Sequence, residues 1–324
     1  MMPKGEHEQD FLILFEGLEQ LGARYQQQLG ALNQAKRQQR TLKLLKRGHV
    51  LQVMQQRRHE RAVRERNRQM RAAMLERRGT QTPDEPQAKN YFSTKRIAVY
   101  TSLFGAYDDI CEPLICPDNI DYYIVTDQEL PADSAWQPID ASVVPPAADT
   151  GIARNRWAKM HPHLLFPNHE YSLYLDCNCW IVSDLTPLIA TLESYPVAMF
   201  PHKNRDCVYD EVEACLLQRK DDPESLEAHR RALAEHGVAR HAGLLEATVI
   251  ARKHHAPESV ELMQRWWQEF CSHSNRDQIG LADCLWQMDI PANRLATLHL
   301  CGTGTTAPEC SLFVMMPHRS ASQG

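Results

Sequence analysis

The sequence predicts an α/β protein with a mostly parallel central sheet, preceded by a long helical arm. Two observations lead to this fold class. Beyond residue 95, short runs of β-branched and aromatic residues alternate with helical segments. Before residue 79, the chain is polar, charged and rich in helix-forming residues. We divide the chain into an arm at 1–78, a Pro-containing linker at 79–94, a body at 95–318 and a short tail at 319–324.

The arm begins with the spacing of a helix seam. Apolar residues recur there at steps of three and four, at Phe11, Leu14, Leu18, Leu21, Tyr25, Leu29, Leu32 and Ala35. The seam weakens over residues 36–78, although the composition still favours helix. Because a lone helix buries little apolar surface, we expect residues 11–35 to self-associate as a coiled coil.

Charge is unevenly distributed along the chain. Residues 36–78 carry 15 Lys+Arg against 3 Asp+Glu, whereas residues 79–324 carry 19 against 33. A basic helix attached to an acidic body favours peripheral binding to an anionic membrane surface. Nucleic acid is not the expected partner, because residues 36–78 contain no aromatic residue that could stack on bases.

The expected location is the cytoplasm, with attachment at the inner face of the membrane. The polar N-terminus carries no secretory signal, and no apolar run approaches the ~20 residues that span a bilayer. The ten cysteines include no Cys-x-x-Cys pair. This favours free thiols in a reducing compartment over a structural zinc site.

The body reads as strands alternating with helices. Strands are expected at 97–103 and 122–126, followed by a Pro/Ala/Asp-rich loop at 131–151, a helix at 154–164 and a strand at 171–176. Further strands are expected at 197–200 and 244–251, and helices at 258–271 and 277–287.

The strand at 171–176 ends in Asp176-Cys177-Asn178. Ligands of α/β sheets bind at the carboxyl ends of strands, and hard cations such as Mg²⁺ and Mn²⁺ prefer oxygen ligands. Asp176 and Asn178 therefore form a candidate metal site. The alternative is that Asp176 only shapes a turn.

Two further blocks flank this motif. Residues 154–167 precede the strand with Arg156 and Lys159, and Arg276-Asp277-Gln278 follows far downstream. This order resembles a GT-A-type glycosyltransferase-like domain, in particular that of plant mucilage- and pectin-related proteins and of bacterial polysaccharide loci, which is distantly similar to glycogenin-like transferases. The resemblance implies a Rossmann-like GT-A domain, a Mn²⁺ or Mg²⁺ cofactor, a nucleotide-sugar donor, and a polysaccharide, lipopolysaccharide or lipid-linked glycan acceptor.

The resemblance also assigns roles. It places the donor nucleotide at Thr101, Phe104, Gly105 and Tyr107, and the donor phosphates or sugar at Arg156 and Lys159, with His202 lining the pocket. Catalytic roles fall to Asp277, Gln278 and Glu246, and His299 becomes a third metal ligand beside Asp176 and Asn178. From the residues alone, each has a plain alternative: a solvated basic face for Arg156 and Lys159, a helix cap for Asp277, and a packed core histidine for His299.

Two other functions stay open. A glycoside hydrolase would use paired carboxylates such as Asp176 and Asp277. A non-catalytic scaffold would bind sugar or nucleotide without turnover, and Asn178, in place of the second Asp of glycogenin-like enzymes, keeps this alternative open.

Overall fold

The computed structural model describes residues 94–105, 108–193, 195–298 and 312–316. The arm at 1–78, nearly all of the linker, Tyr107, His299 and the tail lie outside the described residues. The expected domain boundaries and the helical arm therefore stay predictions.

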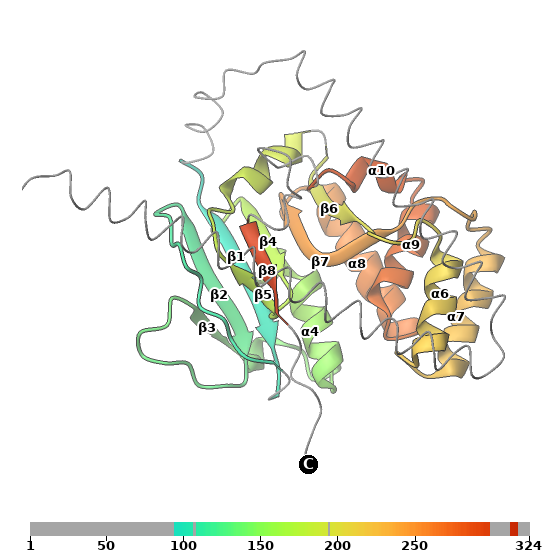
Figure 1. Ribbon diagram of the computed structural model, residues 1–324, viewed down its shortest axis with the longest axis horizontal. Coiled ribbons are helices and arrows are strands. Elements are labelled where there is room, and N and C mark those ends of the chain that lie inside the picture. The colour runs from blue at the N-terminus through green and yellow to red at the C-terminus, as the bar shows by residue number, and fades with distance from the viewer. Residues whose placement is uncertain (1–93, 106–107, 194, 299–311, 317–324) are drawn as a thin grey trace, which may run out of the picture. The chain divides into compact units, whose positions relative to one another are not determined.

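The core of the protein is a six-stranded sheet in the order β3-β2-β1-β4-β7-β6 (Figure 1). Its strands are β1 (Ile97–Leu103), β2 (Ile120–Thr126), β3 (Gln137–Asp140), β4 (Tyr171–Leu175), β6 (Val197–Pro201) and β7 (Leu245–Arg252). The pairs from β3 to β4 are parallel, and β7 is antiparallel to both of its neighbours. Five of the six strands therefore run in one direction, which confirms the expected mostly parallel α/β domain.

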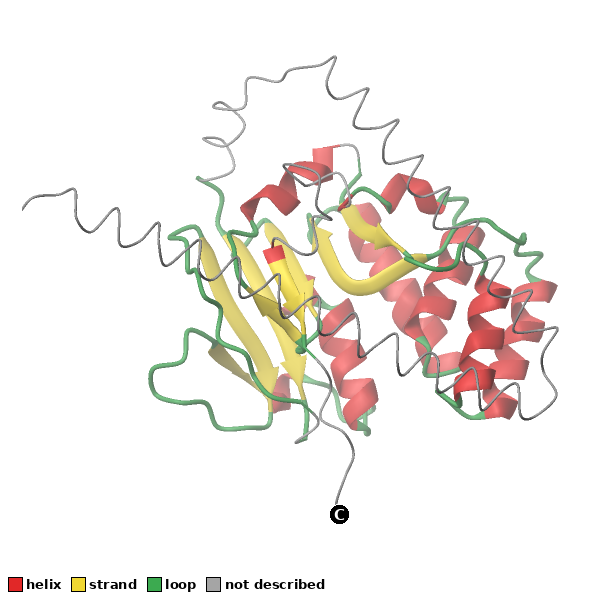
Figure 2. Cartoon of the chain, viewed as in Figure 1, coloured by secondary structure: helices red, strands yellow, loops and turns green. Residues whose placement is uncertain are grey.

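Helices cover this sheet (Figure 2). They are α4 (Gly151–Met160), α5 (Pro162–Leu165), α6 (Val208–Gln218), α7 (Pro223–Glu235), α8 (Pro257–Ser272), α9 (Asp277–Gln287) and α10 (Ala292–Leu295), with 3-10 turns η1 (Ala141–Val143) and η2 (Thr186–Glu193). A small antiparallel pair joins β5 (Cys179–Ile181) to β8 (Phe313–Met315). None of the described helices combines the length and the apolarity needed to cross a membrane.

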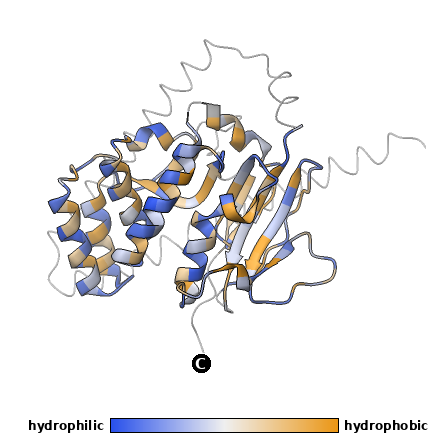
Figure 3. Ribbon diagram, turned by 180° about the vertical axis from the view of Figure 1, so that it is seen from behind, coloured by the Kyte–Doolittle hydropathy of each residue, from blue (hydrophilic) through white to orange (hydrophobic). Residues whose placement is uncertain are grey.

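The sheet is buried on both faces. In a strand, alternate side chains point to opposite faces, so Ile97 and Val99 join the apolar cluster that includes Leu188 of η2. Ala98 and Tyr100 join the other cluster, with Met160 of α4, Trp266 of α8 and Leu281 of α9. This two-sided burial explains why β1 and β4 are continuous runs of buried residues. The helices present mixed polar and apolar faces (Figure 3).

The structure corrects the expected helix at 154–164. Helix α4 begins earlier, where the Thr150 hydroxyl accepts a hydrogen bond from the Ala153 N–H at 3.1 Å. It ends at Met160, because Pro162 disfavours helical geometry at His161 and cannot donate a backbone hydrogen bond. The expected loop at 131–151 also contains a strand, β3, and helices α6 and α7 were not foreseen.

The guanidinium of Arg252 is fully buried against the C-terminal end of α4. Arg252, the last residue of β7, donates hydrogen bonds to the Lys159 carbonyl at 2.7 Å and to the Tyr100 hydroxyl at 2.6 Å. Its guanidinium also lies 5.7 Å from the centre of the Tyr100 ring. The last carbonyls of a helix carry partial negative charge, so the charge of Arg252 is partly compensated there. Burial lowers the pKa of Arg252 from its usual value, and the interaction with Tyr100 opposes that shift.

We expect Arg252→Ala to destabilise the fold by about 3 kcal/mol, because it leaves a cavity and two buried polar groups without their donor. The midpoint of thermal unfolding of the full chain should fall by several degrees. Arg231→Ala, at an exposed position of α7, is the matched control and should leave the midpoint unchanged. Equal midpoints for the two variants would show that Arg252 is not a structural cation.

Candidate functional site

The site lies where β1, β4 and β7 meet. Tyr100 of β1 pairs with Tyr174 of β4, and Asp176 follows directly after β4. The Asp176 N–H donates to the Thr248 carbonyl of β7 at 2.9 Å, which fixes the start of the turn after β4. Thr101 and Asp176 line the same narrow space. The Thr101 hydroxyl oxygen is buried and has no hydrogen-bond partner among the described residues. Two residues predicted from separate parts of the sequence are therefore brought together.

A buried ammonium group connects the two predicted carboxylates. The Lys159 Nζ donates to Asp277 Oδ2 at 2.9 Å and to Asp176 Oδ1 at 3.4 Å. It also lies 5.0 Å from the centre of the Tyr174 ring. The side chain of Lys159 is 2% exposed, whereas that of Asp176 is 34% exposed. The cluster is thus closed on the lysine side and open to solvent at Asp176.

Asp277 is held by two cations at once. The Arg156 Nε lies 3.0 Å from the same Asp277 Oδ2 that receives the lysine. Burial by itself would raise the pKa of Asp277, but the charges of Arg156, Lys159 and Arg276 together hold it well below its usual range. Asp277 is therefore an ionised carboxylate at neutral pH and a poor proton acceptor.

The Asp277 carboxylate contacts both α4 and the start of its own helix. Helix α9 begins at Asp277, and the N-cap residue is Arg276, with no side-chain capping bond. Asp277 Oδ2 contacts Arg156 and Lys159 on α4, while Oδ1 accepts from the Gln278 N–H at 3.2 Å. The solvated-face alternative is wrong for Lys159, which is buried.

Gln278 and Glu246 lie next to β7. The Gln278 Nε2 donates to the Leu245 carbonyl at 3.3 Å. Glu246 follows Leu245, and its carboxylate lies 3.9 Å from the Lys203 Nζ and accepts from the Lys203 N–H at 3.4 Å. Glu246 is half-buried and lies on β7 two residues before Thr248, whose backbone carbonyl holds the Asp176 N–H. The register between β6 and β7 shifts in this stretch of β7.

Asn178 is tied to the second, smaller sheet. The Asn178 Nδ2 donates to the Met316 carbonyl at 3.0 Å, and the backbone carbonyl of Asn178 accepts from the Met316 N–H at 2.7 Å. The neighbouring cysteines are not candidate ligands, because burial raises the pKa of Cys177 to about 12 and raises that of Cys179 as well. Both are therefore thiols at neutral pH.

The donor set of this site fits a hard cation only in part. Asp176 Oδ1 already accepts hydrogen bonds from Lys159 and from the Tyr174 hydroxyl, the latter at 3.0 Å. The second carboxylate oxygen of Asp176 accepts none of these hydrogen bonds, and the side-chain oxygen of Asn178 is the second predicted ligand. Mg²⁺ and Mn²⁺ are commonly held by one or two carboxylates plus substrate phosphates. Two such atoms therefore suit a cation whose coordination is completed by a substrate.

Phe104 and Gly105 lie after β1, as expected. Phe104 is buried, with the Arg154 guanidinium 5.4 Å from its ring centre. The Gly105 N–H donates to both carboxylate oxygens of Asp127, at 3.0 and 3.2 Å. Gly105 has φ +68°, and no atom lies within 4 Å of the position a Cβ would take. Its left-handed backbone conformation favours glycine at this position.

His202 is not part of the Lys159 cluster. Its Nδ1 accepts hydrogen bonds from the N–H groups of Arg205 at 2.9 Å and Asn204 at 3.2 Å, which shapes the turn that leads into α6. Its Nε2 lies 3.7 Å from the Glu211 carboxylate of α6. Burial, with a smaller effect of the Arg205 charge, lowers the pKa of His202 to about 4. These contacts are those of a neutral structural histidine, and its expected place in the donor pocket stays a prediction.

The sequence interpretation missed two polar members of the cluster. Tyr174 was read as a core residue, yet its hydroxyl donates to Asp176, and burial raises its pKa so that it stays protonated. Asn155 donates to the Ser102 carbonyl at 2.9 Å and to the Ser102 hydroxyl at 2.8 Å, and so joins α4 to the end of β1. Tyr174 could have been found, since residues two apart on a strand share a face.

Comparison with known families now bears on this geometry. Residues 148–303 match the family described as TOD1/MUCI70, glycosyltransferase-like domain. This segment, just under half of the chain, is similar to that glycosyltransferase-like domain. The matched segment includes α4, the turn at Asp176, β7 and the start of α9, and the match confirms the resemblance seen in the sequence.

Other comparisons add little. No curated protein matches the chain. Among solved structures, the apo structure of the bifunctional glycosyltransferase WbbM is similar, with 10% sequence identity and a TM-score of 0.41. That similarity covers 64% of this chain, and this chain spans only 39% of WbbM.

The low pKa of Asp277 leads to a prediction for stability against pH. A carboxylate whose pKa is lower in the folded state stabilises the fold above its unfolded pKa of about 3.9, and that stabilisation is lost on acidification. Asp277→Asn should therefore cost about 3 kcal/mol at pH 7, because the buried Lys159 loses its nearer carboxylate and Arg156 loses the same one. The difference from wild type should shrink progressively below about pH 5.

Chemical denaturation at a series of pH values measures this difference. Asp133→Asn, at an exposed position, is the matched control and should follow the wild type at every pH. A difference between wild type and Asp277→Asn that is the same at about pH 2.5 as at pH 7 would contradict an ionised Asp277 as its source.

Proposed function

We propose that the domain transfers a sugar from a nucleotide-diphosphate donor to a polysaccharide, lipopolysaccharide or lipid-linked glycan acceptor. The observation that carries this proposal is the pair of cations, Arg156 and Lys159, held by Asp277 beside the exposed carboxylate of Asp176. Departure of a nucleoside diphosphate builds negative charge on its oxygens, and fixed cations stabilise that charge. The family match supports the reaction class.

A divalent cation, Mg²⁺ or Mn²⁺, is part of the proposal. Asp176 and Asn178 would hold it, with His299 as a third ligand from outside the described residues. When bound, it would neutralise charge on the donor diphosphate. The chain's own contribution is Lys159, which donates to Asp176 Oδ1. This contact would orient the carboxylate and leave Oδ2 for the cation.

The carboxylates divide the work. Asp277, permanently ionised and paired, acts in this proposal by positioning Arg156 and Lys159. Glu246, whose partner is the more exposed Lys203, is the better placed to orient or deprotonate an acceptor hydroxyl. Gln278, whose Nε2 donates to the Leu245 carbonyl, can contribute its amide oxygen to the recognition of sugar hydroxyls. In the same proposal, Thr101, Phe104, Gly105 and Tyr107 form the side that receives the nucleotide.

Glycoside hydrolysis is disfavoured by the same geometry. A hydrolase that used Asp176 and Asp277 would need one of them protonated at neutral pH to act as general acid. The pKa of Asp277 moves in the opposite direction, since Arg156 and Lys159 hold it below its usual range.

A donor panel tests the proposal. Purified full chain is incubated with Mn²⁺ or Mg²⁺ and a set of nucleotide sugars, and released nucleoside diphosphate is measured. We expect slow donor hydrolysis for one nucleotide sugar, and more rapid release when a glycan acceptor is supplied. Donor-dependent thermal stabilisation without any release would instead support a scaffold, and glycan cleavage without donor would support a hydrolase.

We expect Asp176→Ala to abolish cation-dependent donor binding, because it removes the charged ligand and leaves only the neutral amide of Asn178. Isothermal titration calorimetry of nucleoside diphosphate, with and without Mn²⁺, measures the effect. The wild type should bind at least tenfold more tightly with Mn²⁺, and the variant should show no such difference. Asp133→Ala is the matched control. Unchanged turnover in EDTA would remove the metal from the proposal.

The arm, which lies outside the described residues, has its own proposal. We propose that residues 11–35 drive self-association and that residues 36–78 bind anionic lipid at the cytoplasmic face of the membrane. Each Lys or Arg near such a surface contributes about 1 kcal/mol, screened by salt. Full chain should float with acidic vesicles at low salt and be released at high salt. A chain beginning near residue 90 should not float. Equal flotation with neutral vesicles would contradict the electrostatic account.

A further inference from the structure

Two segments that are distant in the sequence run side by side at the edge of the sheet near α6. The His202 N–H donates to the Leu244 carbonyl at 2.8 Å, and the Gly243 N–H donates to the Asp206 carbonyl at 2.9 Å. These contacts join the loop after β6 to the segment before β7. They bring His241 against the first turn of α6.

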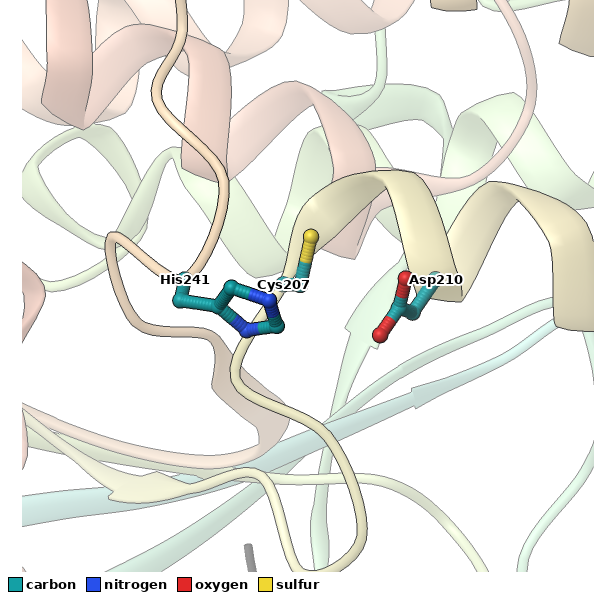
Figure 4. Close-up of side chains that lie close together, drawn as sticks. All are labelled: Cys207, Asp210 and His241. Carbon is teal, nitrogen blue, oxygen red and sulfur yellow. The ribbon is translucent and has the colours of Figure 1, made fainter. Parts of the chain in front are cut away.

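Three side chains with different metal-binding atoms converge there. One sulfur, one carboxylate oxygen and one imidazole nitrogen, from Cys207, Asp210 and His241, all lie within 4.8 Å of one another. Cys207 is fully buried at the N-cap of α6, where it makes no side-chain capping bond. Figure 4 shows the Asp210 carboxylate and the His241 ring pointing toward one another across the start of this helix. The three residues are separated by three and thirty-one positions, so no short motif in the sequence marks them.

A fourth side chain orients the imidazole. The His241 Nδ1 lies 2.9 Å from Asp206 Oδ1. A carboxylate only accepts hydrogen bonds, so Nδ1 carries the proton and the lone pair of the neutral ring is on Nε2. Metal-ligating histidines usually donate their other ring nitrogen to a carboxylate in this way. His241 also has φ +61°, a left-handed conformation that costs a non-glycine residue energy and that clusters at functional sites.

We propose that Cys207, Asp210 and His241 bind a zinc ion, with Asp206 as the positioning residue for His241. Zinc takes thiolate, imidazole and carboxylate ligands in four-coordinate sites, so three protein ligands leave one position for water. The Arg240 guanidinium lies 3.7 Å from Asp210 and is largely exposed, so zinc competes with a weak surface ion pair.

This site differs in chemistry from the one at Asp176. Its thiolate favours zinc, whereas the carboxylate and amide oxygens of Asp176 and Asn178 favour Mg²⁺ or Mn²⁺. Zinc here would link the loop after β6 to the segment before β7. Lys203 lies on the first of these segments and Glu246 lies at the start of β7, directly after the second, so the ion would stiffen the region that holds this ion pair.

A second cluster in the described part of the chain is the natural control. His229, Glu269 and His273 also place three ligand atoms together, with His273 Nδ1 2.6 Å and His229 Nε2 3.5 Å from Glu269 Oε1. These contacts are those of a carboxylate between two imidazoles, and the cluster offers no thiolate. The two clusters can therefore be distinguished by whether sulfur binds the metal.

Cobalt substitution tests the proposal independently of activity. Full chain is stripped with a chelator under a phosphine reductant and titrated with Co²⁺, which gives a near-ultraviolet charge-transfer band when thiolate is a ligand. Zinc affinity then follows by displacement. We expect one equivalent with a thiolate band in the wild type, and loss of that band in Cys207→Ser. His241→Gln and Asp210→Asn should weaken zinc binding at least tenfold, and Asp206→Asn about 10–100-fold. His273→Gln should match the wild type.

Several outcomes would overturn the site. They are a thiolate band that persists in Cys207→Ser, an absent band in the wild type, or unchanged zinc affinity in both His241→Gln and Asp210→Asn. Circular dichroism of each variant in chelator checks folding. If Cys207→Ser does not fold, the two milder variants decide the question, because each keeps the thiol. Binding at the Asp176 site produces no thiolate band, so failure of the proposed function leaves this result unaffected.

Discussion

The ion pair between Lys159 and Asp277 is the interaction on which the rest of the site depends. An ammonium group with a 2% exposed side chain has lost its water, and only close carboxylates make that burial tolerable. Asp277 supplies one carboxylate and Asp176 the other, so the ion pairs join α4, the turn after β4 and the start of α9. Arg252 holds the same helix by donating a hydrogen bond to the backbone carbonyl of Lys159. The end of α4 is thereby held at its side chain and at its backbone.

This arrangement gives the two carboxylates different properties although both touch one ammonium. Asp277 is enclosed by cations and cannot exchange protons near neutral pH. Asp176 is open to solvent on one side and can take a further positive charge there. With Arg156 and Lys159 facing Asp176 and Asp277, the inner cluster is balanced without any bound ion. A cation that arrives with an anionic substrate therefore adds to a site that is already stable.

Much of the fold could be predicted from the sequence because its signals are local. The strand at 97–103 and the helix at 277–287 were expected with the bounds that β1 and α9 have, since apolar runs and helical periodicity depend on neighbours. The break of α4 at Pro162 is local too and could have been found. The burial of Lys159 could not be predicted. The three-residue spacing of Arg156 and Lys159 is the same whether that helix face is solvated or lies in the core. The partner of Lys159 lies 118 residues away. The placement of His202 likewise depends on Glu211 and on a turn that no pattern indicated.

The reversed direction of β7 has a consequence for how this protein can change. Strand β7 is antiparallel to β4 and β6. The segment that precedes β7 therefore lies at the same end of the sheet as the segments that follow β4 and β6. The segments 202–206 and 240–244 therefore lie at the end of the sheet where Asp176 follows β4, and they are joined there by backbone hydrogen bonds. At the opposite end of these strands, Lys253 follows β7 and Glu170 precedes β4, so these two residues are remote from Asp176. Insertions there should be neutral for substrate choice, and the two ends can diversify independently.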